Sequence, residues 1–225
     1  MKKQVVILFA SFFLPYITLA DDFIGKSAFS PDINFNFKIN ETYTINTKVE
    51  SVYSATGQEN GNWIQSYDGT DFQLFLTRRL NPFQRIAAGY QLGLDPEGSH
   101  SHRLIQQFTW RSRATGFTPG NRLRLDQTFS EDRPIRVRLR YRFSAEIPLQ
   151  GEVLDPREFF LLTSGEAIIS TQEDTQDLET RLVMQTGYLI KAGQKLQLGI
   201  DFRSRASQEF INNNLLIKLG LAITL

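Results

Sequence analysis

Apolar and polar residues alternate over most of the chain after residue 20. The clearest example is 135–147, IRVRLRYRFSAEI, where arginine occupies every second position from Arg136 to Arg142. A helix would scatter these residues around its circumference, whereas a β-strand sends successive side chains to opposite faces. The segment therefore predicts a strand with one apolar face and one cationic face.

The same alternation, interrupted by turn residues, predicts eleven clear strands. They span Ile33–Ile39, Thr42–Tyr53, Asp71–Leu80, Arg85–Leu94, His102–Arg113, Asn121–Phe129, 135–147, Phe159–Ile169, Leu178–Ile190, Lys195–Arg205 and Asn213–Leu225. Several exceed ten residues, which is longer than most strands of soluble proteins. No Pro/Ser-rich linker and no change in composition divides them, so we expect one domain over residues 21–225.

The connections between these strands predict a membrane barrel. Short connections lie at Asn40–Glu41, 81–84, 115–120 and 191–194, and longer, more acidic ones lie at 54–70, 95–101, 170–177 and 206–212. Short turns at one side and long loops at the other are typical of a transmembrane β-barrel, although 130–134 and 148–157 depart from this order.

The direction of the first clear strand gives the strand count. Ile33–Ile39 enters a short turn, so it must run downward, and an ascending strand is required before it. Asp22–Phe29 is the candidate. Because single-chain bacterial barrels have an even number of antiparallel strands, we predict an all-β, transmembrane, antiparallel up-and-down barrel of twelve strands, with ten as the alternative.

Residues 1–20 have the composition of a secretory signal peptide. Lys2 and Lys3 precede an apolar run that ends in small residues at Ala20. We expect cleavage there, with an uncleaved membrane anchor as the alternative. The chain has 25 Lys and Arg and 24 Asp and Glu, so loss of Lys2 and Lys3 leaves a net charge of −1. This balance gives no indication of nucleic acid as a partner.

Other features of the mature chain favour a barrel in the outer membrane of a Gram-negative bacterium. No later segment has about 18 consecutive apolar residues, which excludes a helical span. Cysteine is absent, so disulfides do not stabilise the exported chain. Aromatic residues cluster toward strand ends, as two interfacial girdles would require. They are Tyr43, Tyr53, Tyr90, Trp110, Phe159 and Tyr188.

The last strand carries a second indication of this location. Lys218, Gly220, Ile223 and Leu225 resemble the C-terminal signal read by the outer-membrane assembly machinery, although that signal usually ends in phenylalanine. The expected partners are therefore outer-membrane lipid, lipopolysaccharide and this machinery. Alternation alone leaves open a soluble periplasmic antiparallel β-sandwich, in which the arginines would face bulk water.

Several segments together resemble an uncharacterised family of bacterial outer-membrane barrels, the domain of unknown function 2490. They contain His102-Arg103-Leu104, Arg122 through Gln127, Arg136 through Leu149, Glu166 and Gly187-Tyr188. The resemblance extends from about residue 70 to the end of the chain. It implies a fold and a location, and it implies no particular activity.

The charged strand faces are expected to point into the barrel. An arginine on the lipid face near the bilayer midplane costs about 2–4 kcal/mol, so four on one strand would be prohibitive. Counting alternate positions along the strands then gives a set of inward residues, here called the charged ladder. It comprises Arg103, Arg122, Arg124, Asp126, Arg136, Arg138, Arg140, Arg142, Glu146, Glu166, Glu179, Arg181, Asp201 and Arg203.

The charged ladder has two interpretations. Its arginines could pair with the carboxylates and plug the barrel, or their excess could line a narrow passage or pocket for an anionic solute or a lipid headgroup. Small barrels fill with their own side chains, and only much larger ones leave an aqueous channel. The predicted strand number therefore favours the plug.

A barrel-type lipid hydrolase is the enzymatic alternative. It needs a serine beside a histidine, and the chain has only His100 and His102. Ser112 and Ser144 are conceivable partners of His102, but no His-x-Ser-Asn type of motif occurs. Residues 172–177, QEDTQD, lack the spacing of a calcium loop, and no nucleotide fingerprint occurs. We therefore expect a non-enzymatic protein without catalytic residues, metal or cofactor.

Overall fold

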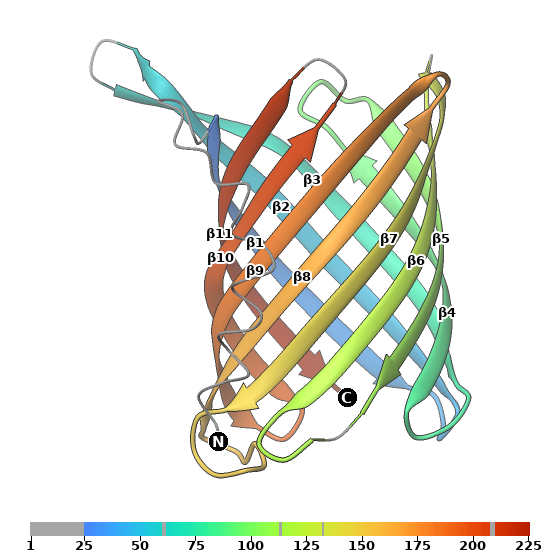
Figure 1. Cartoon of the computed structure of the whole chain (residues 1–225), viewed down its shortest axis with the longest axis vertical. Coiled ribbons are helices and arrows are strands. Elements are labelled where there is room, and N and C mark those ends of the chain that lie inside the picture. Colours follow the sequence, from blue (N-terminus) through green and yellow to red (C-terminus); the bar gives the residue numbers. More distant parts are fainter. Residues whose placement is uncertain (1–24, 60–61, 113, 132, 208–209) are drawn as a thin grey trace.

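The computed structural model describes residues 25–59, 62–112, 114–131, 133–207 and 210–225, which form one closed barrel of eleven strands (Figure 1). The strands are β1 (Lys26–Lys38), β2 (Tyr43–Glu59), β3 (Asn62–Arg79), β4 (Gln84–Leu94), β5 (His100–Arg111), β6 (Thr118–Ser130), β7 (Arg133–Pro148), β8 (Phe159–Gln172), β9 (Thr175–Lys191), β10 (Gln194–Ala206) and β11 (Ile211–Thr224). The expected signal peptide lies outside the described residues.

The barrel closes through a parallel pair. Neighbouring strands are antiparallel in chain order, but β1 pairs with β11 in parallel, from Lys26 beside Asn214 to Asn36 beside Thr224. An odd number of alternating strands leaves the first and last pointing the same way, so one parallel pair is required. All eleven clear strands of the sequence are confirmed, and the predicted totals of twelve and ten are wrong.

The error in the count arises at Ser30-Pro31-Asp32. Proline between two polar residues is typical of a turn, and this tripeptide separated the expected segments Asp22–Phe29 and Ile33–Ile39. In the structure β1 runs straight through it. Pro31 lacks an N–H group, and pairing with β2 is interrupted only between Phe29 and Asp32 before resuming in the same register.

The predicted division into long and short connections is also wrong. Odd-numbered strands begin and even-numbered strands end at one end of the barrel, here called the upper rim. At the other end, the lower rim, odd-numbered strands end, even-numbered strands begin and Leu225 lies (Figure 1). The polar segments 54–70 and 170–177 are mostly strand, with β8 and β9 joined through Glu173 and Asp174. The longest connection, 149–158, lies at the lower rim.

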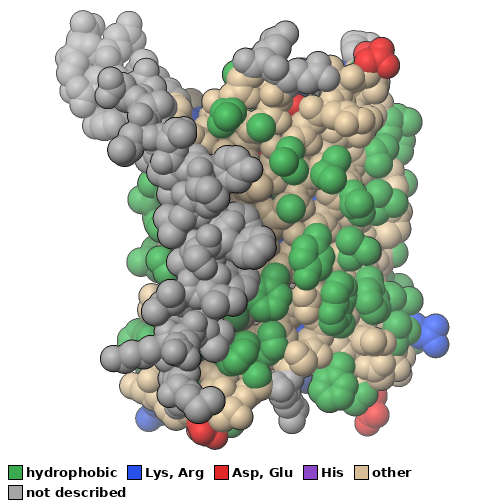
Figure 2. Space-filling view, viewed as in Figure 1, with side chains coloured by type: hydrophobic (Ala, Val, Ile, Leu, Met, Phe, Trp, Pro, Cys, Tyr) green, Lys and Arg blue, Asp and Glu red, His purple; other side chains and the backbone are tan. Residues whose placement is uncertain are grey.

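The barrel has an apolar exterior and a charged interior. Val137 and Leu139 are 40% and 48% exposed, whereas the neighbouring Arg140 is buried. Large exposed apolar residues occur on all eleven strands, and Figure 2 shows them over the visible wall of the barrel. The closed topology shows that the β-sandwich alternative is wrong.

Aromatic side chains fill part of the interior where a neighbouring strand has glycine. Phe160 on β8 lies against Gly187 on β9, and Phe75 on β3 lies against Gly89 on β4. A side chain at either position would place its Cβ atom within the van der Waals radius of the partner ring. Phe75 also packs with Ile105, so apolar groups are enclosed within the barrel together with the charges.

Candidate functional site

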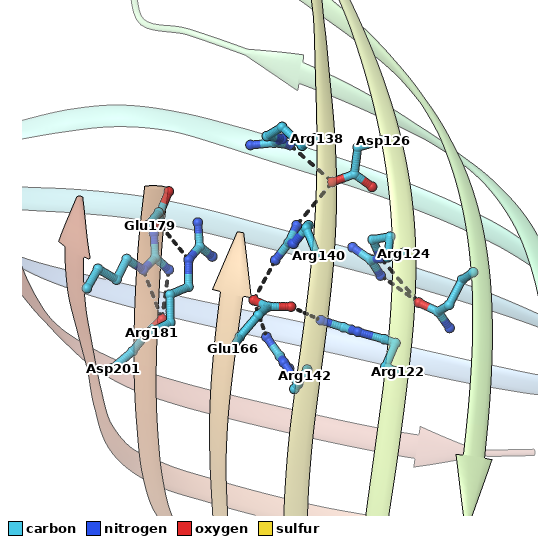
Figure 3. Close-up of polar contacts among 12 residues, drawn as sticks. Arg122, Arg124, Asp126, Arg138, Arg140, Arg142, Glu166, Glu179, Arg181 and Asp201 are labelled. Carbon is cyan, nitrogen blue, oxygen red and sulfur yellow. Dashed lines mark hydrogen bonds and ion pairs between the residues drawn. The ribbon is translucent and has the colours of Figure 1, made fainter. Parts of the chain in front are cut away.

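Glu166 on β8 is the centre of the interior charges. Its Oε1 accepts a hydrogen bond from Arg122 at 2.7 Å, and its Oε2 accepts bonds from Arg140 at 2.8 Å and Arg142 at 3.1 Å (Figure 3). Arg140 and Arg142 are two residues apart on β7, so their side chains share a face, and Arg122 reaches over from β6. One buried carboxylate therefore binds three guanidinium groups.

Asp126 on β6 extends these contacts toward the upper rim. Its Oδ2 lies 3.3 Å from a guanidinium nitrogen of Arg140 and 3.4 Å from one of Arg138. Arg140 thus bridges Asp126 and Glu166. We call the six residues the central network: Arg122, Asp126, Arg138, Arg140, Arg142 and Glu166. Its two carboxylates face four arginines, so it retains an excess of positive charge.

The other acids of the charged ladder are paired nearby. Contacts join Arg181 to Glu179 at 2.5 Å, Arg203 to Asp201 at 2.8 Å and Lys195 to Glu146 at 2.5 Å. The first two pairs join residues two apart on one strand, which therefore face the same way. The third joins β10 to β7, which are not neighbours, so it links different parts of the wall across the interior.

Arg103 and Arg124 have neutral hydrogen-bond partners. Arg103 donates to Gln91 at 2.9 Å and Thr128 at 3.0 Å, and Arg124 donates to Gln107 at 2.9 Å. The Arg124 guanidinium also lies 5.2 Å from the ring centre of Phe75, a cation–π distance. These arginines add positive charge that carboxylate hydrogen bonds do not neutralise.

The expected strand bounds left out the interior carboxylates Asp177 and Asp32. Asp177 accepts hydrogen bonds from Arg136 and Arg205, and Asp32 lies 3.5 Å from Lys48. Both were assigned to connections, although each continues the alternation of its strand. Asp177 shares the parity of Glu179, and Asp32 shares that of Lys38. Extending each strand by a few residues would have found them.

The interior opens into a separate cavity at each rim. The upper cavity, of about 500 Å³, has basic and acidic residues in its lining, including Arg103, Arg138 and Asp71. The lower cavity, of about 640 Å³, is lined by Lys38, Arg79, Arg85, Glu41, Asn40 and three threonines. None of the residues that the structure describes lines both cavities.

The residues considered for lipid hydrolysis are not brought together. His102 lies near the upper rim on the outer face, where its Nδ1 and the Tyr90 hydroxyl share a hydrogen bond of 2.5 Å. Ser112 follows the end of β5 at the lower rim. Ser144 is paired with Gly120 near the same rim and donates its hydroxyl to the Gly120 carbonyl. His102 is therefore remote from both serines.

The described residues include no group of three or more His, Asp or Glu side chains placed to hold a metal ion. They also include no helix long and apolar enough to cross a membrane.

The residues of the proposed C-terminal signal divide between the two faces of β11. Lys218 points inward and donates to Glu50 at 2.8 Å, and Gly220 faces Asp32. Leu225 is exposed at the lower rim, and Ile223 shares its parity. Lys218 therefore takes part in the interior ion pairs in addition to any role during assembly, which stays a prediction.

Comparison with known proteins gave a family match and no match to an individual protein. Neither the curated proteins nor the solved structures gave a match. The model of a protein family of unknown function, DUF2490, matches residues 31–214. This range covers most of the barrel, begins earlier than the resemblance seen in the sequence, and contains every residue of the central network. The chain belongs to the DUF2490 family of β-barrel proteins of unknown function.

Proposed function

We propose that this protein is an outer-membrane β-barrel that is closed at mid-height by the central network and acts as a non-enzymatic envelope protein. Its partners would be outer-membrane lipid and lipopolysaccharide around the wall, and the assembly machinery during insertion. The single observation that carries closure is the burial of the network. The Asp126, Glu166 and Arg140 side chains are 0%, 1% and 7% exposed.

The outer surface supports the membrane location. Large apolar side chains are exposed around the whole circumference, an arrangement that a soluble protein avoids and a lipid bilayer would cover. Aromatic residues pair on this surface in the upper half, as Tyr53 with Tyr67, and near the lower rim, as Phe159 with Tyr188. In Figure 2 most visible acidic and basic side chains lie near the two ends.

The interior supports a plug over an open passage. Water in a continuous channel would reach the carboxylates and guanidinium groups at its narrowest level, but Asp126 and Glu166 are enclosed. Phe160 and Ile168 are also fully buried inside the wall. Eleven strands lie nearer to the small barrels that fill with side chains than to porins of 16–18 strands.

Conductance across planar bilayers tests closure. We expect the wild-type protein to give no steady conductance, since the side chains of the network fill the middle of the barrel. The triple variant Asp126→Ala, Arg140→Ala, Glu166→Ala should conduct, because it removes the side chains that fill the middle. Stable anion-selective openings of the wild type would overturn the plug and favour the passage.

A matched control keeps this test specific. Glu97→Ala, Glu152→Ala, Lys191→Ala removes the same number of acids and bases from exposed positions and should stay silent. Folding of every variant is checked by the faster gel migration of unheated barrel. Cell fractionation tests the location separately, and recovery of the protein in the soluble periplasm would contradict it.

A further inference from the structure

The lower rim contains a group of four cations that has a single carboxylate contact among the described residues. All four occupy inward positions at strand ends. Lys38 ends β1, Arg79 ends β3, Arg111 ends β5, and Arg85 lies at the start of β4. Among the described residues the only ion pair of this group joins Arg79 to Glu41 at 3.9 Å. Glu41 is 97% exposed, so water screens this contact strongly.

These cations repel one another. Arg79 and Arg85 are directly opposite each other on neighbouring strands, a position in which like charges destabilise a sheet. Arg111 is a third positive charge acting on Arg85. Deeper in the barrel, Arg140 contacts carboxylates and Arg124 contacts an amide oxygen. At the lower rim, the one carboxylate in contact with this group among the described residues is the exposed Glu41.

Three of these cations line a cavity that also has neutral hydrogen-bond donors in its lining. Lys38, Arg79 and Arg85 share the lower cavity with the hydroxyls of Thr44 and Thr77, which are opposite each other on β2 and β3. Its volume of about 640 Å³ lies within the range of small-molecule sites. Guanidinium groups bind phosphate oxygens in pairs, and hydroxyls can donate to the remaining oxygens.

We infer that the lower cavity binds a phosphate-bearing anion through Arg79, Arg85 and Lys38, with Thr44 and Thr77 as further donors. An anion with two or more charges would relieve the repulsion between Arg79 and Arg85. The phosphate could belong to a soluble organic phosphate or to a lipid headgroup, since the rim is open to both. The inference does not depend on membrane location or on closure of the barrel.

Calorimetric titration of the folded full-length barrel in uncharged detergent with inorganic pyrophosphate tests the inference. We expect wild-type binding that weakens with added salt. Arg79→Gln and Arg85→Gln should each reduce the affinity about tenfold or more, because each removes charge-assisted hydrogen bonds. Both variants remove a like-charge pair, so they should fold, and unheated gel migration checks this.

Controls separate a specific site from general attraction. Arg133→Gln removes an arginine from the upper cavity and should retain wild-type affinity. The double variant Arg79→Lys, Arg85→Lys keeps the charge and should bind with intermediate affinity. Pyrophosphate should raise the melting temperature of the wild type and not that of Arg79→Gln, Arg85→Gln.

Competition identifies the source of the phosphate. Displacement of pyrophosphate by phosphatidylglycerol in mixed micelles would indicate a headgroup site, and its absence would indicate a soluble phosphate; both support phosphate recognition. No binding of pyrophosphate or phosphatidylglycerol by the wild type, or equal loss in Arg133→Gln, would overturn the inference. Because conductance has no part in this test, its failure is distinguishable from failure of the plug.

Discussion

At the residue scale, the main interior contact is the binding of three arginines by the Glu166 carboxylate. Glu166 accepts hydrogen bonds from Arg122, Arg140 and Arg142 while almost fully buried. Removing one partner of a buried ion pair leaves an uncompensated charge. Here a single substitution would leave Arg122 and Arg142 without their carboxylate, and Arg140 with Asp126 alone. The contact between Glu146 and Lys195 is shorter but more accessible, because both side chains are 29% exposed.

Glu166→Gln should therefore destabilise the folded barrel much more than Glu146→Gln. We expect a loss of about 3–5 kcal/mol for the first, as for a broken buried pair, and of no more than about 1 kcal/mol for the second, which water screens. Urea unfolding of the barrel in detergent measures both. Equal losses would show that the pairs at Glu166 are not especially strong.

At the element scale, β8 and β9 fit together through the pair of Phe160 and Gly187. Phe160 is fully buried, and its ring covers the face of Gly187, the register partner on β9. The ammonium group of Lys195 on β10 lies 4.8 Å from the ring centre, so the ring also makes a cation–π contact. The absent side chain at Gly187 is what lets an aromatic residue turn inward at this level.

Gly187→Ala should displace Phe160 and destabilise the barrel by about 1–3 kcal/mol, the usual cost of overpacking. Gly220→Ala is the control, since a Cβ there would meet its nearest neighbours at 3.6 Å, an ordinary contact. It should leave stability unchanged or slightly higher. Thermal unfolding of refolded protein measures both, and an unaffected Gly187→Ala would contradict the packing argument.

At the scale of the whole molecule, the odd number of strands fixes the relation between the ends of the chain. β1 begins at the upper rim beside β11, and Leu225 lies at the lower rim. If the C-terminal residues were read by the assembly machinery from the periplasm, the lower rim would face the periplasm and the start of β1 the cell exterior. The lower cavity would then open to the periplasm.

Cysteine labelling tests this orientation. Because the chain has no cysteine, Glu97→Cys at the upper rim and Glu152→Cys at the lower rim each give one thiol without background. A membrane-impermeant maleimide should label Glu97→Cys on intact cells. It should label Glu152→Cys only after the outer membrane is permeabilised, and the reverse pattern would show the opposite orientation.

The sequence by itself determined the strands and their sidedness. Strict alternation, as in Val137, Arg138, Leu139 and Arg140, has a period that only a β-strand converts into two distinct faces. Eleven segments and the inward direction of the charged ladder follow from this local property. The relation to the DUF2490 family was also visible in short motifs around Arg122, Arg136 and Glu166, and the family match confirms it.

Two polar segments were assigned to connections, although in the structure they are mostly strand. Ser30-Pro31-Asp32 has turn composition, yet β1 continues through it. β11 pairs with all three residues, and β2 pairs with β1 on either side of Ser30 and Pro31. Residues 170–177 are polar on both faces, so no alternation marked the strand ends. The turn at Glu173 and Asp174 has no glycine, the usual signal of a two-residue hairpin.

Only the tertiary structure decided how the barrel closes and which charges meet. The parallel pairing of β1 with β11 depends on the closed circumference, which no local segment specifies. Likewise, alternation places Arg122 and Glu166 on inward faces, but the register of β6, β7 and β8 makes them partners. The clustering of Arg79 and Arg85 at one mouth also follows from register, because pairing between strands sets which charges become neighbours.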